Sequence, residues 1–384
     1  MVRAADTADG VASLGRLLVA PGVDAAVDAT ERAQRRVLDH RAIGGSAGEF
    51  LVPVGARRAA LGPLLAYRRL RPWRPRLGRL AVAGALGAGF GALLGPRRRL
   101  VAAPDEDLLI DRLAEALGEP GLLFAGTART CREFVTPVLQ LLRPDGRTVG
   151  FAKLGWDVVT DAMVVNERDA LERVARVGVP GLRVPAVRWA GTWNGHAVLV
   201  TAPMPSGMAR LRRDAPIPTA PLRALAELDG PLRRSTLAGS AHWAAARATA
   251  LGDPELEARL EHIDRTWGEV ELDLGRWHGD WVGWNLGSDR EGLHAWDWAY
   301  SAPEVPFGFD AIHFAYLPRQ VLGGLDPDRA SAAAAPSATA ALAALGIPEE
   351  PRAALLALHR LEVDLREARA RALRASAAPG GPRP

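Results

Sequence analysis

The pattern of apolar residues changes once along this 384-residue chain, near residues 202–205, and this change constrains the fold more than any other feature. From about residue 120 to residue 201, short strand-like runs alternate with turn residues, and the Asp145–Gly146 pair supplies the positive φ angles of a tight hairpin turn. One helical stretch, residues 160–177, interrupts these runs. After residue 205, segments rich in Ala, Leu and Arg follow with helical spacing. We therefore expect an α+β chain with a β-rich half, a helical half, and a ligand site where the halves join.

Composition and cysteine content exclude several classes of protein. Apolar residues make up 48% and charged residues 24%, as in ordinary globular proteins, which excludes a wholly disordered chain and a collagen-like repeat. The single cysteine, Cys131, excludes an internal disulfide and a zinc site built from cysteines. The first ten residues lack the basic-then-apolar pattern of a secretory signal, so we expect a cytoplasmic protein.

Positive charge is concentrated near the N-terminus. Residues 1–103 contain 17 Arg and 7 acidic residues, and residues 51–104 contain 11 Arg and no acidic residue. The rest of the chain carries a net negative charge and shows no zinc-finger, RNA-recognition or helix-turn-helix pattern, so we expect no nucleic-acid partner. We expect residues 1–118 to form a mainly helical, Arg-rich N-terminal extension, with one helical stretch at about residues 28–40.

This extension contains a 16-residue apolar stretch, residues 80–95, flanked by Arg on both sides. It is shorter than the roughly 20 residues that cross a bilayer, and five of its residues are glycine. Two interpretations stay open. The stretch forms a buried helix or hairpin, or it lies on a membrane surface with the neighbouring Arg residues near anionic headgroups. The second interpretation would make residues 51–104 a peripheral membrane contact.

Lysine usage singles out one position. Of the 48 Lys and Arg residues, 47 are Arg and one, Lys153, is Lys. Since the chain uses Arg wherever a solvated positive charge suffices, Lys153 marks a position that needs a compact ammonium group rather than a planar guanidinium. Chance is the alternative, and the residue count alone does not decide between the two.

Residues 276–300 carry the densest chemical pattern in the sequence. The run His278–Asp280 is followed after four residues by Asn285 and, beyond a predicted hairpin, by Asp297. Carboxylate and amide oxygens suit Mg²⁺, which prefers hard oxygen ligands. We therefore expect Asn285 and Asp297 to bind the metal, which leaves Asp280 free to orient and deprotonate a hydroxyl nucleophile.

The aromatic and imidazole side chains of this stretch have simpler expected roles. We expect His278 to order the loop rather than to take part in chemistry. The alternation around Asp297 predicts that Trp296 and Trp298 pack in the core. Trp281 and Trp284 lie beside Asp280 in the sequence, and their roles stay open between packing and substrate stacking.

The spacing H-x-D-x-x-x-x-N with a downstream Asp is that of the catalytic loop of phosphoryl-transfer enzymes. The stretch resembles the aminoglycoside phosphotransferase and choline kinase family, in which HGD replaces the HRD of protein kinases. Residues 306–314 look like that family's G-D-x-x-x-D-L region, with Asp310 at the later Asp, although Phe309 rather than an earlier acid precedes it. The resemblance covers about residues 120–320. It implies a bilobal protein-kinase-like fold, with a small β-rich N-lobe and a helical C-lobe.

The resemblance also assigns residues to a nucleotide site. Lys153 lies on the third predicted strand, where the family's ATP-phosphate lysine lies, and Glu167 on the following helix matches the acid that pairs with it. Glu172 is the nearest competing acid, but Glu167 fits the family's R-E-x-x-x-L pattern better. The last strand and hinge, which hold adenine in the family, correspond here to the segment with Ala202 and Met204.

The phosphate-binding loop is the poorest match to the family. A G-x-G-x-x-G loop is absent from the sequence between the first two predicted strands of the N-lobe. Backbone N–H groups of Thr127, Ala128, Arg129 and Thr130 could still cradle phosphates. A plain hairpin turn is the alternative for this segment.

These patterns predict four segments: an N-terminal extension (1–118), a nucleotide-binding N-lobe (119–204), a helical C-lobe with the catalytic loop (205–376) and a disordered tail (377–384). The resemblance implies an ATP- and Mg²⁺-dependent phosphotransferase that acts on a hydroxyl of a small molecule such as a sugar, amino alcohol or aminoglycoside. The alternatives are a non-catalytic nucleotide-binding scaffold on the same fold and a membrane-associated kinase of a lipid-linked precursor.

Overall fold

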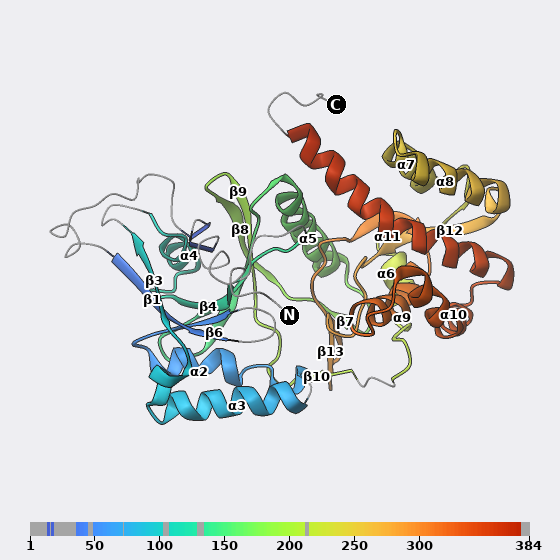
Figure 1. Cartoon of the computed structure of the whole chain (residues 1–384). Helices are drawn as coiled ribbons and strands as arrows, with labels where there is room; N and C mark the ends of the chain where they lie inside the picture. Colours follow the sequence, from blue (N-terminus) through green and yellow to red (C-terminus); the bar gives the residue numbers. More distant parts are fainter. Residues whose placement is uncertain are drawn as a thin grey trace. The chain divides into compact units, whose positions relative to one another are not determined.

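The computed structural model describes residues 14, 15, 17, 18, 36–44, 49–71, 73–102, 107–128, 134–211 and 215–377. The chain divides into two compact units, one made of residues 1–168 and 185–208 and the other of residues 169–184 and 209–384. The first unit is built around a β-sheet and the second is mainly helical, so the predicted α+β class is confirmed (Figure 1). Within the described ranges, no helix is both long enough and apolar enough to cross a membrane.

The first unit contains an eight-stranded sheet with the order β3-β1-β2-β4-β5-β6-β9-β8. Every neighbouring pair of strands in it is antiparallel. Its strands are β1 (Arg36–Ile43), β2 (Glu49–Pro53), β3 (Arg97–Ala102), β4 (Leu123–Ala128), β5 (Val138–Leu142), β6 (Thr148–Leu154), β8 (Val187–Trp193) and β9 (His196–Thr201). The predicted hairpin joins β5 to β6, and Gly146 at its turn has a φ of 88°, a conformation that favours glycine.

The N-terminal strands correct the sequence analysis. The prediction of a separate, mainly helical extension over residues 1–118 is wrong in one respect, because β1, β2 and β3 join the same sheet as the strands that follow residue 118. The helix predicted at residues 28–40 is strand β1 from Arg36 onward, and residues 28–35 lie outside the described residues. Arg36 pairs with Ala102, and pairing between such distant segments overrides the local periodicity that suggested a helix.

Helices cover both faces of this sheet. α4 (Leu109–Leu117) packs into one core cluster with Leu51 of β2, and α2 (Arg57–Leu65) packs into another with Val52. Consecutive residues of a strand point to opposite faces, so the two helices lie on opposite sides of the sheet. The remaining helical elements of this unit are η2 (Arg68–Leu70), α3 (Trp73–Gly87), η3 (Phe90–Leu94) and α5 (Val158–Val177), whose last residues are assigned to the second unit.

The apolar stretch at residues 80–95 forms the end of α3 and all of η3. Among the residues of α3, Ala83 alone is buried, and no residue of η3 is buried. The interpretation of this stretch as a buried element therefore holds only for the inner side of α3, where Ala83 is buried and Val82 and Leu86 pack against the same cluster. α3 packs on α2, on the side of α2 away from the sheet (Figure 1).

The second unit places its helices around two small sheets. Its helices are α6 (Leu222–Ala226), α7 (Ala241–Ala250), α8 (Pro254–Trp267), α9 (Phe309–Val321), α10 (Pro327–Ala344) and α11 (Glu349–Ala377). One sheet has the order β10-β13-β14-β7 and the other β11-β12-β15. The strands are β7 (Leu182–Arg183), β10 (Ala209–Arg210), β11 (Arg233–Thr236), β12 (Glu271–Trp277), β13 (Leu286–Asp289), β14 (Gly292–Ala295) and β15 (Ala302–Pro306).

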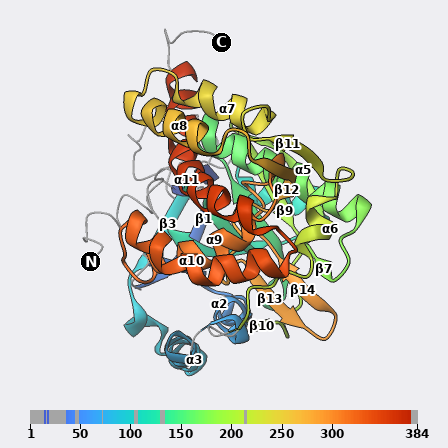
Figure 2. The same ribbon diagram turned by 90° about the vertical axis from the view of Figure 1, so that its right-hand side faces the viewer.

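The long helix α11 contacts several parts of this unit. α7 and α8 pack on it and on each other, and α9 and α10 also contact it (Figures 1 and 2). The helix continues to Ala377, the first residue of the predicted disordered tail, and the rest of that tail lies outside the described residues.

Candidate active site

The predicted catalytic loop joins β12 to β13 in the second unit. β12 ends at Trp277, the run His278–Asp280 follows, and Asn285 directly precedes β13. β13 and β14 form the predicted hairpin, with Leu286 paired to Ala295. At the open end of this hairpin the Trp296 N–H donates to the Asn285 carbonyl, at 3.2 Å, which brings the chain before Asp297 next to Asn285.

His278 orders this loop from within. The Asp280 N–H donates to its Nδ1, at 3.1 Å, so Nδ1 carries no proton and Nε2 donates to the Trp296 carbonyl, at 3.2 Å. Burial lowers the pKa of His278 to about 4, which keeps the ring neutral. Its ring lies against Trp298, with centroids 4.3 Å apart, and edge-on to Trp281. The neutral, fully bonded ring has the loop-ordering role expected for it.

The aromatic side chains of the loop divide between packing and exposure. Trp281 and Trp298 are fully buried, so both pack in the core. Trp296 is half-buried, so its predicted core position is only partly correct. Trp284 is the most exposed of these four.

Asp310, the second residue of α9, fixes the backbone of the loop. Its carboxylate accepts hydrogen bonds from the His278 N–H, at 2.7 Å, and the Gly279 N–H, at 3.0 Å. Burial raises the pKa of Asp310 to about 6, and the two backbone hydrogen bonds act in the opposite direction. Gly279 has a φ of 86°, and a Cβ there would lie 2.3 Å from the Tyr300 carbonyl oxygen, so this position requires glycine.

Phe309, the residue before Asp310, lies among the aromatic rings of the second unit. The ring is fully buried, and its centroid lies 5.8 Å from that of Trp277 and 5.6 Å from that of His359. This position packs in the core of the second unit, so an apolar side chain suits it.

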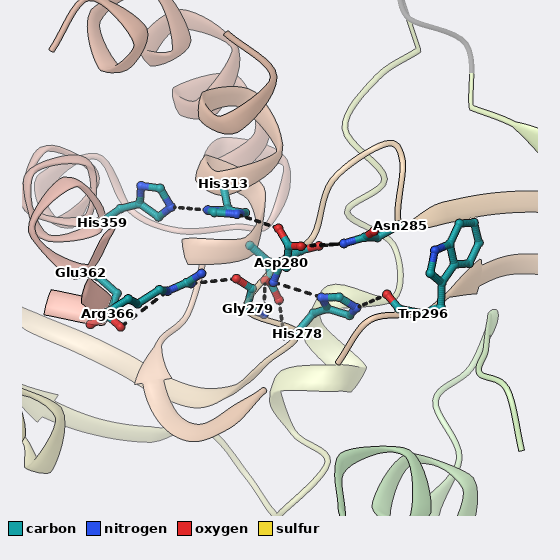
Figure 3. Close-up of polar contacts among 10 residues, drawn as sticks. His278, Gly279, Asp280, Asn285, Trp296, His313, His359, Glu362 and Arg366 are labelled. Atoms are coloured by element: carbon teal, nitrogen blue, oxygen red, sulfur yellow. Dashed lines mark hydrogen bonds and ion pairs between the residues drawn. The ribbon is translucent and has the colours of Figure 1, made fainter. Parts of the chain in front are cut away.

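Asp280 is held by side chains from two directions (Figure 3). The Asn285 amide nitrogen donates to its Oδ2, at 2.7 Å, and His313 of α9 contacts its Oδ1 through Nε2, at 3.1 Å. His313 Nδ1 in turn lies 3.1 Å from Nε2 of His359 on α11. Because a carboxylate only accepts, we assign the Nε2 proton to His313 and the bridging proton between the rings to His359.

The electrostatics of this chain favour an ionised Asp280 beside neutral imidazoles. Burial acts to raise the pKa of Asp280, but the polar groups around the carboxylate, first of all the hydrogen bond from His313, outweigh it, and the pKa is lowered. Burial lowers the pKa of His313 and, further, that of His359. The Asp280 side chain keeps an exposed fraction of 17%, so a solute can approach it.

Arg366 of α11 also holds the loop, at the Gly279 carbonyl. Its Nη2 donates to the Gly279 carbonyl, at 2.7 Å, and its guanidinium lies over the rings of Trp277 and Tyr300, 4.6 and 4.7 Å from their centroids. Gly279 is therefore fixed through both its N–H and its carbonyl. Figure 3 shows Arg366 beside Glu362, one turn earlier on the same helix.

The sequence analysis missed three residues of this site: His313, His359 and Arg366. His313 follows Asp310 by three positions, so it lies on the same side of α9. His359, Glu362 and Arg366 follow the spacing of one face of α11. Polar residues with helical spacing on otherwise apolar, buried faces were the signal that could have indicated them.

In the first unit, the one lysine of the chain is paired as the resemblance implies. Lys153 on β6 forms an ion pair with Glu167 on α5, and both side chains are largely buried. Glu172, the competing acid, is exposed. A largely buried ion pair on a strand and the following helix is a costly arrangement in a protein interior, which supports a specific role for it.

The predicted phosphate-cradling segment lies partly inside strand β4. Thr127 pairs with Phe50 of β2, and Ala128 pairs with Glu49, so these two residues belong to a strand rather than a loop. The extra strands at the N-terminus explain the difference, since they extend the pairing along β4. Arg129 and Thr130 lie outside the described residues.

The predicted adenine-binding residues follow β9. The Ala202 N–H donates to the Ala186 carbonyl, at 2.7 Å, and the Met204 carbonyl accepts from the Tyr67 hydroxyl, at 2.9 Å. Burial raises the pKa of Tyr67 to about 12. The Ala202 carbonyl and the Met204 N–H make no hydrogen bond to another of the described residues.

The donor set of the predicted metal site fits a hard cation held together with phosphates. The Asn285 nitrogen donates to Asp280, which leaves its amide oxygen as the atom available to a cation. Asp297 supplies a carboxylate and has a φ of 68°, a left-handed conformation that Asp tolerates better than most residues. Among the described residues, no group of three or more His, Cys, Asp or Glu is arranged to hold a metal.

Comparison with solved structures finds small-molecule phosphotransferases. The chain is similar to an aminoglycoside-3'-phosphotransferase of type VIII, with 22% identity over 66% of this chain and 98% of that chain and a TM-score of 0.42. It is also similar to a macrolide 2'-phosphotransferase from Brachybacterium faecium (14% identity, 71% of this chain and 100% of that chain, TM-score 0.40). A third similar structure is a protein from Haemophilus somnus described as a putative fructosamine-3-kinase (11% identity, 67% of this chain and 96% of that chain, TM-score 0.35). No protein-family model and no curated protein matches the chain.

Proposed function

We propose that this protein transfers the γ-phosphoryl group of ATP to a hydroxyl group of a small molecule. The environment of Asp280 carries this proposal. Each oxygen of its carboxylate already holds one hydrogen bond, its pKa is lowered, and part of the side chain is exposed. A fixed, ionised and reachable carboxylate is what orientation of an attacking hydroxyl requires.

Asp280 would accept the proton of the acceptor hydroxyl. The acceptor oxygen forms a bond to the γ-phosphorus, the bond between that phosphorus and the bridging oxygen of ADP breaks, and the hydroxyl proton passes to Asp280. Asn285 and His313 hold the carboxylate oxygens, so the carboxylate has little freedom to turn away from the hydroxyl. Most of the rate gain would come from this positioning and from charge neutralisation.

The nucleotide would be held by residues of the first unit. Lys153, oriented by Glu167, would contact the α- and β-phosphates. Adenine presents an amino donor beside a ring-nitrogen acceptor, which matches the Ala202 carbonyl and the Met204 N–H. The proposed phosphate cradle is limited to Arg129 and Thr130, which follow β4, since Thr127 and Ala128 are paired within that strand.

Asn285 and Asp297 would hold Mg²⁺ together with the phosphates. Bound there, the cation would neutralise charge on the transferred group. The carboxylate of Asp297 and the amide oxygen of Asn285 are the hard ligands that this cation prefers.

The acceptor is proposed as a small hydroxylated molecule such as a sugar or an amino alcohol. Residues 301–384 contain nine acidic and nine Arg residues, so this part of the chain offers no excess of negative charge for a polycation. An aminoglycoside acceptor is therefore less favoured than a neutral or weakly charged one.

Phosphotransferase assays on the full chain test this proposal. Purified protein is incubated with ATP, Mg²⁺ and a panel of sugars, amino alcohols and aminoglycosides, and phosphorylated product is detected by phosphorus NMR. Asp280→Asn should lower kcat by about 100-fold or more with ATP affinity nearly unchanged. Asp289→Asn, in strand β13 of the same hairpin, serves as the matched control and should keep its activity. ATP binding without transfer to any compound would instead favour the non-catalytic scaffold.

A further inference from the structure

The outer surface of α3 and η3 exposes large apolar side chains. The inner side of α3, which includes Ala83, packs into the cluster formed with α2 and β2. The opposite side carries Trp73 and Leu77, one turn apart, and Phe90 and Leu93 follow on η3. Their exposed fractions are 63% for Trp73, 56% for Leu77, 60% for Phe90 and 83% for Leu93. We call these four residues the outer face.

Charged side chains are absent from the sequence that connects the two ends of this face. No residue between Arg79 and Arg97 is charged. Arg79 itself turns inward, where it donates to the Pro63 carbonyl, at 3.2 Å, and lies over the ring of Phe50. The surface of α3 and η3 beyond Arg79 is therefore formed by apolar and small residues.

Positive charge borders the outer face. The Arg74 guanidinium lies 5.2 Å from the centroid of the Trp73 ring, at the start of α3. At the other end of the same helix, the Arg57 side chain lies next to Gly87: one of its guanidinium nitrogens is 3.8 Å from the position that a Cβ on Gly87 would take. Among the described residues, no acidic side chain forms an ion pair with Arg57 or Arg74. Residues 51–104 contain no acid at all, so negative charge has to come from outside this segment.

We propose that the outer face docks the protein on the surface of an anionic lipid bilayer. Trp, Leu and Phe side chains enter the boundary between headgroups and acyl chains, and a border of Arg contacts anionic headgroups. No described helix is able to span the bilayer, so the contact is peripheral. Docking does not depend on the proposed phosphotransfer, since the outer face shares no residue with the candidate active site.

A second copy of the chain is a poorer partner for this face. A symmetric contact between two copies would place the Arg57 and Arg74 groups of both copies around one interface. With no acid in residues 51–104 to separate them, these like charges would repel. An anionic bilayer matches both the apolar centre and the positive border.

Vesicle flotation with the full chain tests the proposal. The protein should float with vesicles that contain phosphatidylglycerol and not with vesicles of phosphatidylcholine alone, and rising salt should reduce flotation. Phe90→Ser with Leu93→Ser should weaken binding by about ten-fold or more, because apolar insertion is lost. Arg57→Gln with Arg74→Gln should weaken it by about 25-fold, from about five-fold for each charge.

A matched pair of substitutions controls for the loss of exposed apolar surface. Leu251→Ser with Leu322→Ser removes two exposed leucines of the second unit and should leave flotation unchanged. All variants should keep the unfolding midpoint of the original protein, since the substituted side chains are exposed. The proposal is overturned by any of three results: no flotation with anionic vesicles at low salt, equal flotation with neutral vesicles, or outer-face variants that float like the original. A dimer in sedimentation that the outer-face substitutions dissociate would also overturn it and assign the face to a second copy.

Discussion

Asp280 receives one hydrogen bond from Asn285, at 2.7 Å, and one from His313, at 3.1 Å, and the substitution His313→Leu deletes the second. Leucine fills much of the space of the imidazole but leaves Oδ1 of a largely buried carboxylate without its donor. Loss of a hydrogen bond to a charged, buried group costs about 1.5–3 kcal/mol. If the whole of this free energy is lost from the stabilisation of the transition state, because Asp280 is no longer held in the orientation that the reaction needs, kcat should fall by about 10-fold to 100-fold.

The pH dependence of this variant follows from the same contact. The hydrogen bond from His313 lowers the pKa of Asp280, against the effect of burial. Removing it raises that pKa, so the carboxylate becomes protonated at a higher pH than before. The acid limb of the kcat profile should therefore move to higher pH in His313→Leu, while the KM for ATP changes little.

Steady-state phosphotransfer from pH 8 down to the lowest pH at which the protein stays folded measures both effects, because the acid limb of the original protein lies below the ordinary pKa of Asp. His313→Gln is the matched variant, because its amide nitrogen can donate to Asp280 as Nε2 of His313 does, and it should recover part of kcat and move the acid limb back. A His313→Leu protein with the original kcat and the original acid limb would refute the reasoning that His313 positions Asp280.

Three further outcomes follow from the site. Lys153→Arg should lower phosphotransfer by orders of magnitude with the fold intact, measured by product formation and circular dichroism, because a guanidinium does not fit the space of the ammonium beside Glu167. Asp297→Asn should raise the Mg²⁺ concentration that gives half-maximal activity, whereas unchanged Mg²⁺ dependence would contradict its assignment as a ligand. In the folded protein the pKa of Asp310 is about 6, above its ordinary value of 3.8. The protonated carboxyl group therefore stabilises the fold fully below pH 3.8, and this stabilisation, up to about 3 kcal/mol, is lost as the pH rises through 6. An Asp310→Asn protein lacks this pH dependence. The difference in free energy of unfolding between the original protein and Asp310→Asn, measured by chemical unfolding, should therefore shrink from pH 4 to pH 8.

Local patterns predicted the parts of the fold that neighbouring residues determine. The hairpin at Gly146 and the hairpin after Asn285 both follow from turn residues between apolar runs, and both are present. The helical second half follows from the spacing of its apolar residues. The position of Lys153 on a strand and Glu167 on the next helix also follows from sequence order, and the two side chains meet.

Long-range pairing lay beyond these patterns. Arg36 in β1 pairs with Ala102 in β3, and nothing within a short window of sequence indicates that partner. For the same reason the contact between Asp280 and His313, 33 residues apart, and that between Gly279 and Arg366, 87 residues apart, did not follow from the loop motif. Such contacts depend on how helices pack, which periodicity alone does not specify.

The geometry of the candidate catalytic loop is set mainly by helices that come after it in the sequence. Asp310 on α9 holds the N–H groups of His278 and Gly279, and Arg366 on α11 holds the Gly279 carbonyl. Gly279 cannot be replaced by a residue with a side chain, because the Tyr300 carbonyl fills the space where a Cβ would lie. These contacts thus fix the position of the Asp280 backbone independently of the contacts that the Asp280 side chain makes. The C-terminal helix α11 therefore belongs to the candidate active site, although the motif that indicates the site ends almost fifty residues before that helix begins.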